Sequence, residues 1–156
     1  MTDAADQAVP MARLLAMSYR LLIDGLHTRL REQGWTDVRP AYGFVLLATR
    51  DDSTTSTELA SVLGVSKQAV SKLVDAMEDA GYVRRSPGVR DARERSVELA
   101  DRGHRLLDAV EQAYRDLEAE WSVVIGERAL EQTRRNLAKV VLAAHDGVFP
   151  SVRPAP

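Results

Sequence analysis

The chain has 156 residues, of which 45% are hydrophobic and 5% aromatic, and this is enough apolar material for one helix-rich domain with its own core. It contains no cysteine, which excludes disulfides, thiolate metal sites and switches based on cysteine oxidation. The net charge of −2 gives no general affinity for nucleic acid, and no apolar run reaches the roughly 18 residues that a membrane span needs.

A long amphipathic helix is predicted over residues 8–33, because apolar side chains recur there at three- or four-residue steps. These side chains are Met11, Leu15, Tyr19, Leu22, Leu26 and Leu30. Gly34 is expected to cap the C-terminus of this helix. Pro40 suits the first turn of a second, almost wholly apolar helix over residues 40–49, and a polar loop is expected over residues 51–55.

Two short helices joined by a tight turn are predicted next. Ser56 or Thr57 is expected to cap the first, over residues 58–63, and Ser66 to cap the second, over residues 67–80. Gly64 permits the positive φ angle that the turn between them needs. The apolar side chains expected to hold the pair together from inside are Leu59, Leu63, Val65, Val70 and Leu73.

A β-hairpin and two more long helices are predicted in the second half of the chain. Strands are expected over residues 82–85 and 95–99, and Ser86-Pro87-Gly88 supplies turn chemistry after the first strand. The apolar stripes of the two helices, which break at Gly126, are Leu106, Val110, Tyr114, Leu117, Trp121 and Val124, then Leu130, Thr133, Leu137, Val140 and Ala144. Residues 147–156, rich in proline, are expected to form a flexible tail.

The outer face of the second short helix carries side chains suited to reading DNA. They are Ser66, Lys67, Gln68, Ser71 and Lys72. Such groups hydrogen-bond base edges and phosphates in the major groove, where Gln68 can hold adenine and Lys67 can donate to guanine. A helix N-terminus also favours a phosphate. The alternative is that serine and lysine serve only capping and solubility here, since this motif recurs in modules that bind no DNA.

The basic excess of the chain is concentrated around the hairpin. Residues 64–95 carry 7 basic and 5 acidic groups, against 6 and 8 in residues 1–63 and 8 and 10 in residues 96–156. A thin β-ribbon with arginine at its tip suits the minor groove, whose negative potential attracts guanidinium. Asp91, an acid in this tip, either pairs with a neighbouring arginine and sets its direction or serves as ordinary turn chemistry.

From about Pro40 to Leu106 the chain resembles the MarR family of winged helix-turn-helix transcription regulators. The resemblance rests on ELA at 58–60, VSKQAVS at 65–71, DAGYVRR at 79–85, DAR at 91–93 and the distal Gly103. It implies a fold that is mainly α with a small β-hairpin wing. Residues 38–100 would form the winged helix-turn-helix lobe that binds DNA, and residues 8–35 and 101–146 the helical dimerisation region.

The resemblance also implies a homodimer that binds a pseudo-palindromic operator in double-stranded DNA and commonly represses transcription until a small-molecule effector releases it. Residues 66–72 would then lie in the major groove, Arg93 and Arg90 in the minor groove, and Arg84 and Thr57 near the phosphate backbone. One departure is Leu99-Ala100, where the family has Leu-Thr. Either Asp101 caps the next helix by a one-residue shift of its start, or the lost cap costs roughly 0.5–2 kcal/mol of stability.

Dimerisation also has a physical argument of its own. Three helices with apolar stripes flank a lobe that is too small to cover them all, so a monomer would expose a large apolar patch. A two-fold partner covers this patch and places two recognition helices about 34 Å apart, which matches one turn of DNA.

Several aromatic and histidine side chains are candidates for a pocket that holds a small aromatic or phenolic anion, and this role is implied by the resemblance alone. They are Tyr19, His27, Trp35, Tyr42 and Tyr114. Each is explained more simply as a packing or interface residue. Metal sensing has weaker support, because His104 with Asp108 and Asp24 with His27 are two-ligand spacings that arise by chance. We therefore expect no metal and no cofactor.

Two other classes of function compete with a DNA-binding regulator. An enzyme would need a convergent set of catalytic groups, and the sequence has neither a glycine-rich phosphate loop nor a nucleophile elbow, so no catalytic residue is expected. A winged-helix module that binds only protein is the closer rival, and it predicts little salt dependence of DNA affinity. The N-terminus lacks a secretory signal, so the cytoplasm is the expected compartment, without membrane contact.

Overall fold

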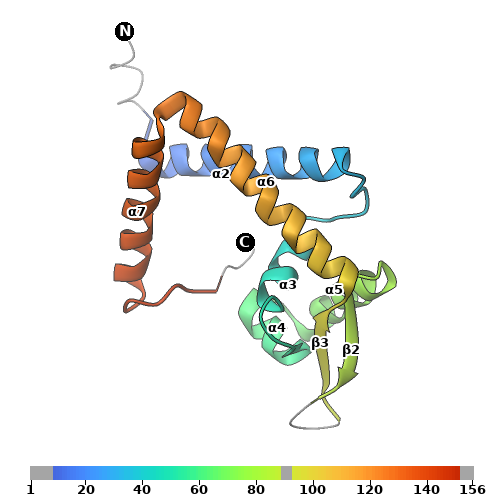
Figure 1. Cartoon of the computed structure of the whole chain (residues 1–156). Helices are drawn as coiled ribbons and strands as arrows, with labels where there is room; N and C mark the ends of the chain where they lie inside the picture. Colours follow the sequence, from blue (N-terminus) through green and yellow to red (C-terminus); the bar gives the residue numbers. More distant parts are fainter. Residues whose placement is uncertain (1–8, 89–92, 152–156) are drawn as a thin grey trace.

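The computed structural model describes residues 9–88 and 93–151, and over these residues the chain folds into long helices with a smaller lobe beneath them (Figure 1). The long helices are α2 (Met11–Glu32), α6 (Asp101–Ile125) and α7 (Glu127–Ala144). The lobe contains α3 (Tyr42–Ala48), α4 (Ser56–Leu63), α5 (Lys67–Asp79) and the strands β1 (Thr54–Thr55), β2 (Val83–Pro87) and β3 (Arg95–Leu99). The fold is mainly helical with a small antiparallel sheet, as the sequence predicts.

Helices α2 and α6 cross at a glycine. A Cβ atom added at Gly25 would lie 2.6 Å from Leu117 Cδ2, so the absence of a side chain lets the two helices approach closely. Arg29 of α2 forms an ion pair with Glu120 of α6 beside this crossing. Within the described part of the chain, none of these helices is long and apolar enough to cross a membrane.

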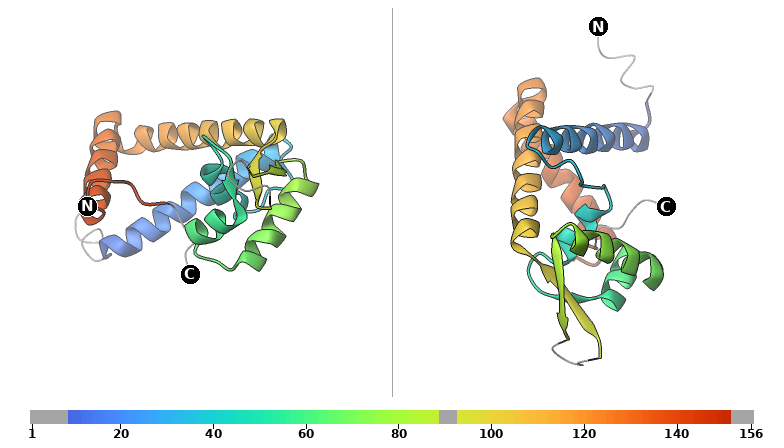
Figure 2. Two further views of the ribbon diagram at one scale, coloured as in Figure 1. Left: turned by 90° about the horizontal axis from the view of Figure 1, so that it is seen from below. Right: turned by 90° about the vertical axis from the view of Figure 1, so that its right-hand side faces the viewer.

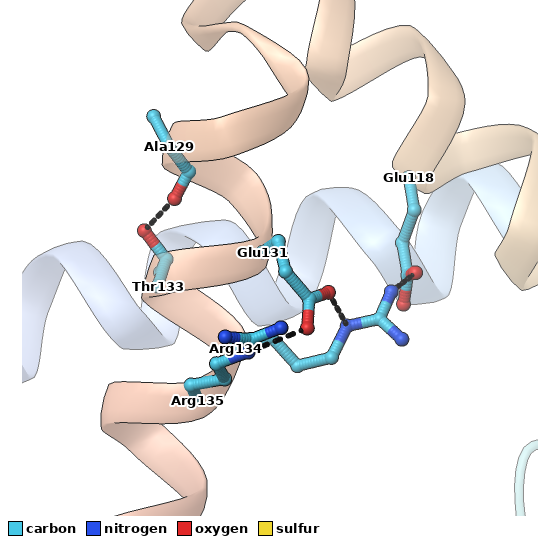
Figure 3. Close-up of polar contacts among 6 residues, drawn as sticks. All are labelled: Glu118, Ala129, Glu131, Thr133, Arg134 and Arg135. Carbon is cyan, nitrogen blue, oxygen red and sulfur yellow. Dashed lines mark hydrogen bonds and ion pairs between the residues drawn. The ribbon is translucent and has the colours of Figure 1, made fainter.

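Helix α7 folds back from the end of α6 at Gly126, whose φ angle is 87°. One ion pair joins the two helices, and neighbouring ion pairs within α7 adjoin it (Figure 3). Arg134 of α7 reaches Glu118 of α6 and lies 4.0 Å from Glu131 one turn away, and Glu131 also accepts a 2.9 Å hydrogen bond from Arg135. No residue of α7 is buried within the chain, so these polar contacts matter for its orientation.

The core of the molecule lies in the lobe and extends upward between α2 and α6. The largest fully buried side chains include Leu46, Leu59, Met77, Leu30 and Leu106, of which the last two come from α2 and α6. The sheet has the order β1-β3-β2, with Val83 opposite Leu99 and Thr54 opposite Val97. Strands β2 and β3 project beyond the helices of the lobe and away from α2, as Figure 1 and the right-hand view of Figure 2 show.

The structure corrects two expectations about the start of the lobe. The predicted loop at 51–55 contains β1, a two-residue strand paired with β3, and Thr55 rather than Ser56 or Thr57 caps α4. The Thr55 hydroxyl accepts a 3.1 Å hydrogen bond from the Glu58 amide, and the Glu58 carboxylate accepts one of 2.8 Å from the Thr55 amide. This reciprocal pair satisfies two amides at once, which a cap one or two residues later does not achieve.

Near the hairpin, one expectation was wrong and one open alternative is decided. The predicted turn residues Ser86 and Pro87 belong to β2 and pair with Ser96 and Arg95. Asp101 does not cap α6 by a shift, because the helix begins at Asp101 and its N-cap is Ala100, which makes no side-chain hydrogen bond. The Asp101 carboxylate lies in the first turn, where it complements the helix dipole. Residue 8 of the predicted first helix and residues 152–156 of the predicted tail lie outside the described residues.

Candidate nucleic-acid interface

The turn between α4 and α5 has the geometry that the sequence predicts. Gly64 ends α4 with a φ angle of 68°, in the left-handed region that favours glycine, and the Val65 amide donates back to the Ala60 carbonyl at 3.2 Å. The Ser66 hydroxyl then accepts a 3.1 Å hydrogen bond from the Ala69 amide and so caps α5. The predicted turn residue Gly64 and the predicted N-cap Ser66 are both confirmed.

Helix α5 has a fully buried face and an exposed polar face at its N-terminal half. Val70, Val74 and Met77 are each 0% exposed, and their spacing of four and three residues fixes which face turns inward. The five side chains predicted to read DNA are all exposed; they are Ser66, Lys67, Gln68, Ser71 and Lys72. Among the described residues, no ion pair engages either lysine.

Val65 lies on the outside of the turn, which corrects the prediction that it packs inside. Its side chain is 40% exposed, and Leu73 is only half-buried. The left-handed conformation of Gly64 directs the chain outward before α5 begins, so the inward positions pass to Val74 and Met77. An apolar side chain thus stands beside Ser66 and Lys67 on the exposed face.

The C-terminal end of α5 is acidic, and its carboxylates hold Arg85 of β2. The guanidinium lies 2.7 Å from Asp75 and 2.6 Å from Glu78, with its side chain only 13% exposed. Burial lowers the pKa of Arg85, but the hydrogen bonds to Asp75 and Glu78 outweigh this effect and raise it above its ordinary value. Arg85 therefore fastens β2 to α5.

Ion pairs with acidic side chains thus leave the hairpin with less uncompensated positive charge at its surface than the count of basic residues in the sequence indicates. The alternation of inward and outward positions along β2 was the signal that separates Arg85 from Arg84. Arg84 is exposed and directly opposite Glu98 on β3, to which its Nε donates at 2.6 Å. This hydrogen bond raises the pKa of Arg84, and Glu98 compensates its charge locally.

The remaining predicted contact residues lie at the outer end of the lobe or beyond the described residues. Arg93 is exposed next to the start of β3, and Thr57 is exposed in the first turn of α4. Arg95 begins β3 and is also exposed, an additional cation at the wing that the site prediction left out. Arg90 and Asp91 lie outside the described residues.

A cavity of about 410 Å³ lies between α2, α3 and α6, where the long helices meet the lobe. Three of the five candidate effector residues line it: Tyr19, His27 and Tyr114. Burial, then the nearby Arg31, lowers the pKa of His27, and burial raises the pKa of Tyr114, so both side chains are neutral at pH 7.

The other two candidate effector residues pack elsewhere. The rings of Trp35 and Tyr42 lie 6.2 Å and 5.8 Å from the ring of Tyr82, centroid to centroid. Sequence reasoning also missed an ion pair in the cavity wall, where Arg50 lies 2.5 Å from Glu111. No local signal joins these two residues, because Arg50, which follows α3, and Glu111 of α6 are far apart in the sequence.

Comparison with known proteins finds a family match within this lobe. Residues 36–94 match the model of the MarR family. The HTH-type transcriptional regulator PetP of Rhodobacter capsulatus is 38% identical over 66 residues, which cover 42% of this chain and 40% of PetP. The match thus spans less than half of the length of that relative.

Solved structures extend the likeness to nearly the whole chain. The reduced form of MarR from E. coli superposes with a TM-score of 0.73 at 27% identity, covering 85% of this chain and 97% of that one. A point mutant of MepR from S. aureus, bound to an oligodeoxyribonucleotide, gives a TM-score of 0.61 at 21% identity over 88% of this chain and 99% of that one. The second likeness concerns the fold alone.

Proposed function

We propose that this chain, whose residues 36–94 match the model of the MarR family and whose fold resembles that of MarR from E. coli, is a winged helix-turn-helix regulator of that family: a sequence-specific, double-stranded DNA-binding regulator of transcription that works as a cytoplasmic homodimer. The observation that carries the proposal is the exposed N-terminal half of α5, with its hydroxyl, amide and ammonium groups and no described ion pair on its lysines. Such a surface suits base edges and phosphates, whereas a surface that binds only protein is poorer in lysine at its centre.

Each predicted contact residue has a role in this proposal. Residues 66–72 enter the major groove, where Gln68 holds adenine and the exposed Val65 suits the methyl group of thymine. Arg93, together with Arg90, enters the minor groove, and Asp91 orients an arginine of the wing. Thr57 and Arg84 lie near the phosphate backbone, which positions the protein without reading sequence.

The homodimer is supported by apolar side chains that one chain leaves uncovered. They gather on the three long helices and include Met11, Leu15, Val123, Val124, Leu137 and Val140. Residues 8–35 and 101–146 would form the dimerisation region, and residues 38–100 the lobe that binds DNA. A second copy buries these side chains and sets two α5 helices about 34 Å apart, so the operator is pseudo-palindromic.

We further propose that the protein represses its operator and that a small aromatic or phenolic anion in the 410 Å³ cavity releases it. The cavity wall is mainly apolar and includes Ile23, Phe44 and Leu107, and the exposed Arg39 stands at its edge as a cation for an anionic group. The cavity touches α2, α6 and the lobe, so an occupant can favour one lobe orientation over another.

The test is selection of bound fragments from the organism's own genome, followed by titration of the selected duplex at increasing salt. A DNA reader enriches defined sequences and loses affinity steeply as salt rises. A module that binds only protein enriches none, and that result would reject the proposal. Selection repeated with Gln68→Ala should change the preferred bases, whereas Gln132→Ala on α7 serves as the matched control and should leave them unchanged.

A further inference from the structure

Three side chains from separate elements meet where the lobe joins the long helices; we call Asp37, Tyr82 and Arg102 the junction cluster. The Tyr82 ring is fully buried, and its hydroxyl donates to the Asp37 carboxylate. Both terminal nitrogens of Arg102 lie 3.3 Å from Asp37 oxygens. The Arg102 guanidinium also lies 4.4 Å from the centroid of the Tyr82 ring, a cation–π distance.

The junction cluster ties α5 to α6 and to the connector that follows α2. Asp37 belongs to the connector between α2 and α3, Tyr82 lies between α5 and β2, and Arg102 is in the first turn of α6. Arg102 also donates to the carbonyl of Ala80, the C-cap residue of α5. One guanidinium therefore fixes the end of α5 against α6 and against the connector.

The backbone at this junction leaves no room for sliding. A Cβ atom added at Gly103 would lie 2.0 Å from the Tyr82 carbonyl oxygen, and the Ala100 amide donates to that oxygen at 3.0 Å. Helix α6 and the segment after α5 are thus in direct backbone contact. Rotation about this contact is the remaining freedom, and the side chains of the junction cluster oppose it.

The junction cluster also adjoins the cavity. Val38, Arg39 and Pro40 line the cavity and follow Asp37 directly in the sequence. The Asp37 side chain is 43% exposed, so its carboxylate does not fill the core. A displacement of the connector at the cavity wall therefore changes the contacts of Asp37 first.

We propose that the junction cluster is a positioning device: Asp37, Tyr82 and Arg102 set the angle of α5 relative to α6, and the connector couples that angle to the cavity. This inference rests on the proposed function, because in a homodimer the angle fixes the separation of the two α5 helices. The cluster residues touch no DNA and act through the recognition helix.

The experiment measures the distance between the two lobes directly. The chain has no cysteine, so Ser61→Cys on the exposed face of α4 gives each protomer one site for a spin label. Pulsed dipolar spectroscopy then yields the distribution of label–label distances. Tyr82→Phe removes only the hydroxyl and keeps the ring, Asp37→Asn removes the charge at an exposed position, and Tyr42→Phe is the matched control at a neighbouring buried ring.

We expect the distance distribution to shift or broaden in Tyr82→Phe and Asp37→Asn and to stay unchanged in Tyr42→Phe. Affinity for the selected duplex should fall about tenfold in the first two variants, which corresponds to one hydrogen bond to a charged group. Distributions that superpose on the parent would overturn the inference, as would loss of cooperative unfolding in Asp37→Asn. Absence of any dipolar signal in the labelled parent would instead contradict the homodimer, and with it the proposed function.

Discussion

The lobe and the long helices differ in how much of their apolar surface a single chain covers. In the lobe, Val70, Val74 and Met77 of α5 are completely buried by their own chain. On the long helices, Val140 of α7 is 68% exposed and Val124 of α6 is 82% exposed. The lobe thus buries its apolar side chains within one chain and presents a polar face, whereas the long helices leave apolar side chains exposed, which the proposed second copy would cover.

The largest expected effect is on the uncovered face of α7. Val140→Glu places an unpaired charge where the proposed partner covers the helix, which costs several kcal/mol, so the dimer should weaken about 100-fold or more. Lys139→Glu introduces the same residue one position earlier, where an exposed charged side chain already stands, and is the control. Sedimentation equilibrium measures both variants. A Val140→Glu chain that dimerises as tightly as the parent would show that this face is not the interface.

The next effect concerns the lobe alone. Arg93→Ala should weaken binding to a selected operator by about 1–3 kcal/mol and leave the dimer intact, because a minor-groove cation is lost. Arg105→Ala removes the same charge from an exposed position on α6 and is the control. Fluorescence anisotropy with labelled duplex compares the two variants. Equal operator affinities of the Arg93 variant and the parent would contradict the proposal that the wing contacts DNA.

Comparison of Arg85 with Arg84 distinguishes a cation that stabilises the lobe from one that is exposed and available to DNA. Arg85→Ala leaves Asp75 and Glu78 without their shared partner and should lower the free energy of unfolding by about 1.5 kcal/mol. Arg84→Ala removes the same charge from an exposed pair on the same strand and should have the smaller effect on stability. Urea unfolding followed by circular dichroism ranks them, and the reverse order would contradict the assignment of Arg85.

A smaller effect is expected where the two regions meet at the cavity. A Cβ atom added at Gly43 meets nothing within 4 Å, and Gly43 lines the cavity from within α3. Gly43→Phe should fill part of the cavity and mimic an occupant, lowering operator affinity about fivefold, the lower end of typical coupling between sites. Gly43→Ala, which adds only a methyl group, should bind as the parent does. Equal operator affinity of the parent, Gly43→Phe and Gly43→Ala would show that the cavity does not influence DNA binding by the lobe.

The smallest effect is a pH dependence at the junction cluster. The hydrogen bond from Tyr82 lowers the pKa of Asp37 below its ordinary value, with Arg102 adding to the shift against an opposing effect of burial. A carboxyl with a depressed pKa in the folded state stabilises it at pH values above its unfolded pKa of about 3.9 and loses this contribution as pH falls through the folded pKa. The stability difference between the parent and Asp37→Asn should therefore be largest at pH 7 and shrink at pH 3. A difference independent of pH would contradict the assignment.

Local sequence signals were sufficient for the helix-turn-helix and insufficient for contacts between distant segments. Gly64 and Ser66 act on their immediate neighbours, so their roles could be predicted from residue type. Val65 was wrongly placed inside, because its direction depends on the turn rather than on helix periodicity. Thr55 was missed as a cap because the cap was assigned one or two residues too late, to Ser56 or Thr57, although Glu58, three residues after Thr55, indicated a capping box.

The junction cluster and the cavity depend on contacts between distant segments, which local sequence signals could not predict. In the sequence, 45 positions separate Asp37 from Tyr82 and 65 separate it from Arg102, and no periodic pattern relates the three residues. Trp35 and Tyr42 were grouped with Tyr19 by residue type, yet they pack on Tyr82. Which aromatic residues share a cavity depends on the angles between helices, and those angles follow from close approaches such as Gly25 against Leu117.

The most direct test of the account is a footprint of the protein on a selected operator with a probe that reports both grooves. We expect two protected segments of major groove with centres about one helical turn, ~34 Å, apart, each flanked by a protected stretch of minor groove. A single protected segment, or uniform protection along the duplex, would contradict the presentation of two matched α5 helices and wings.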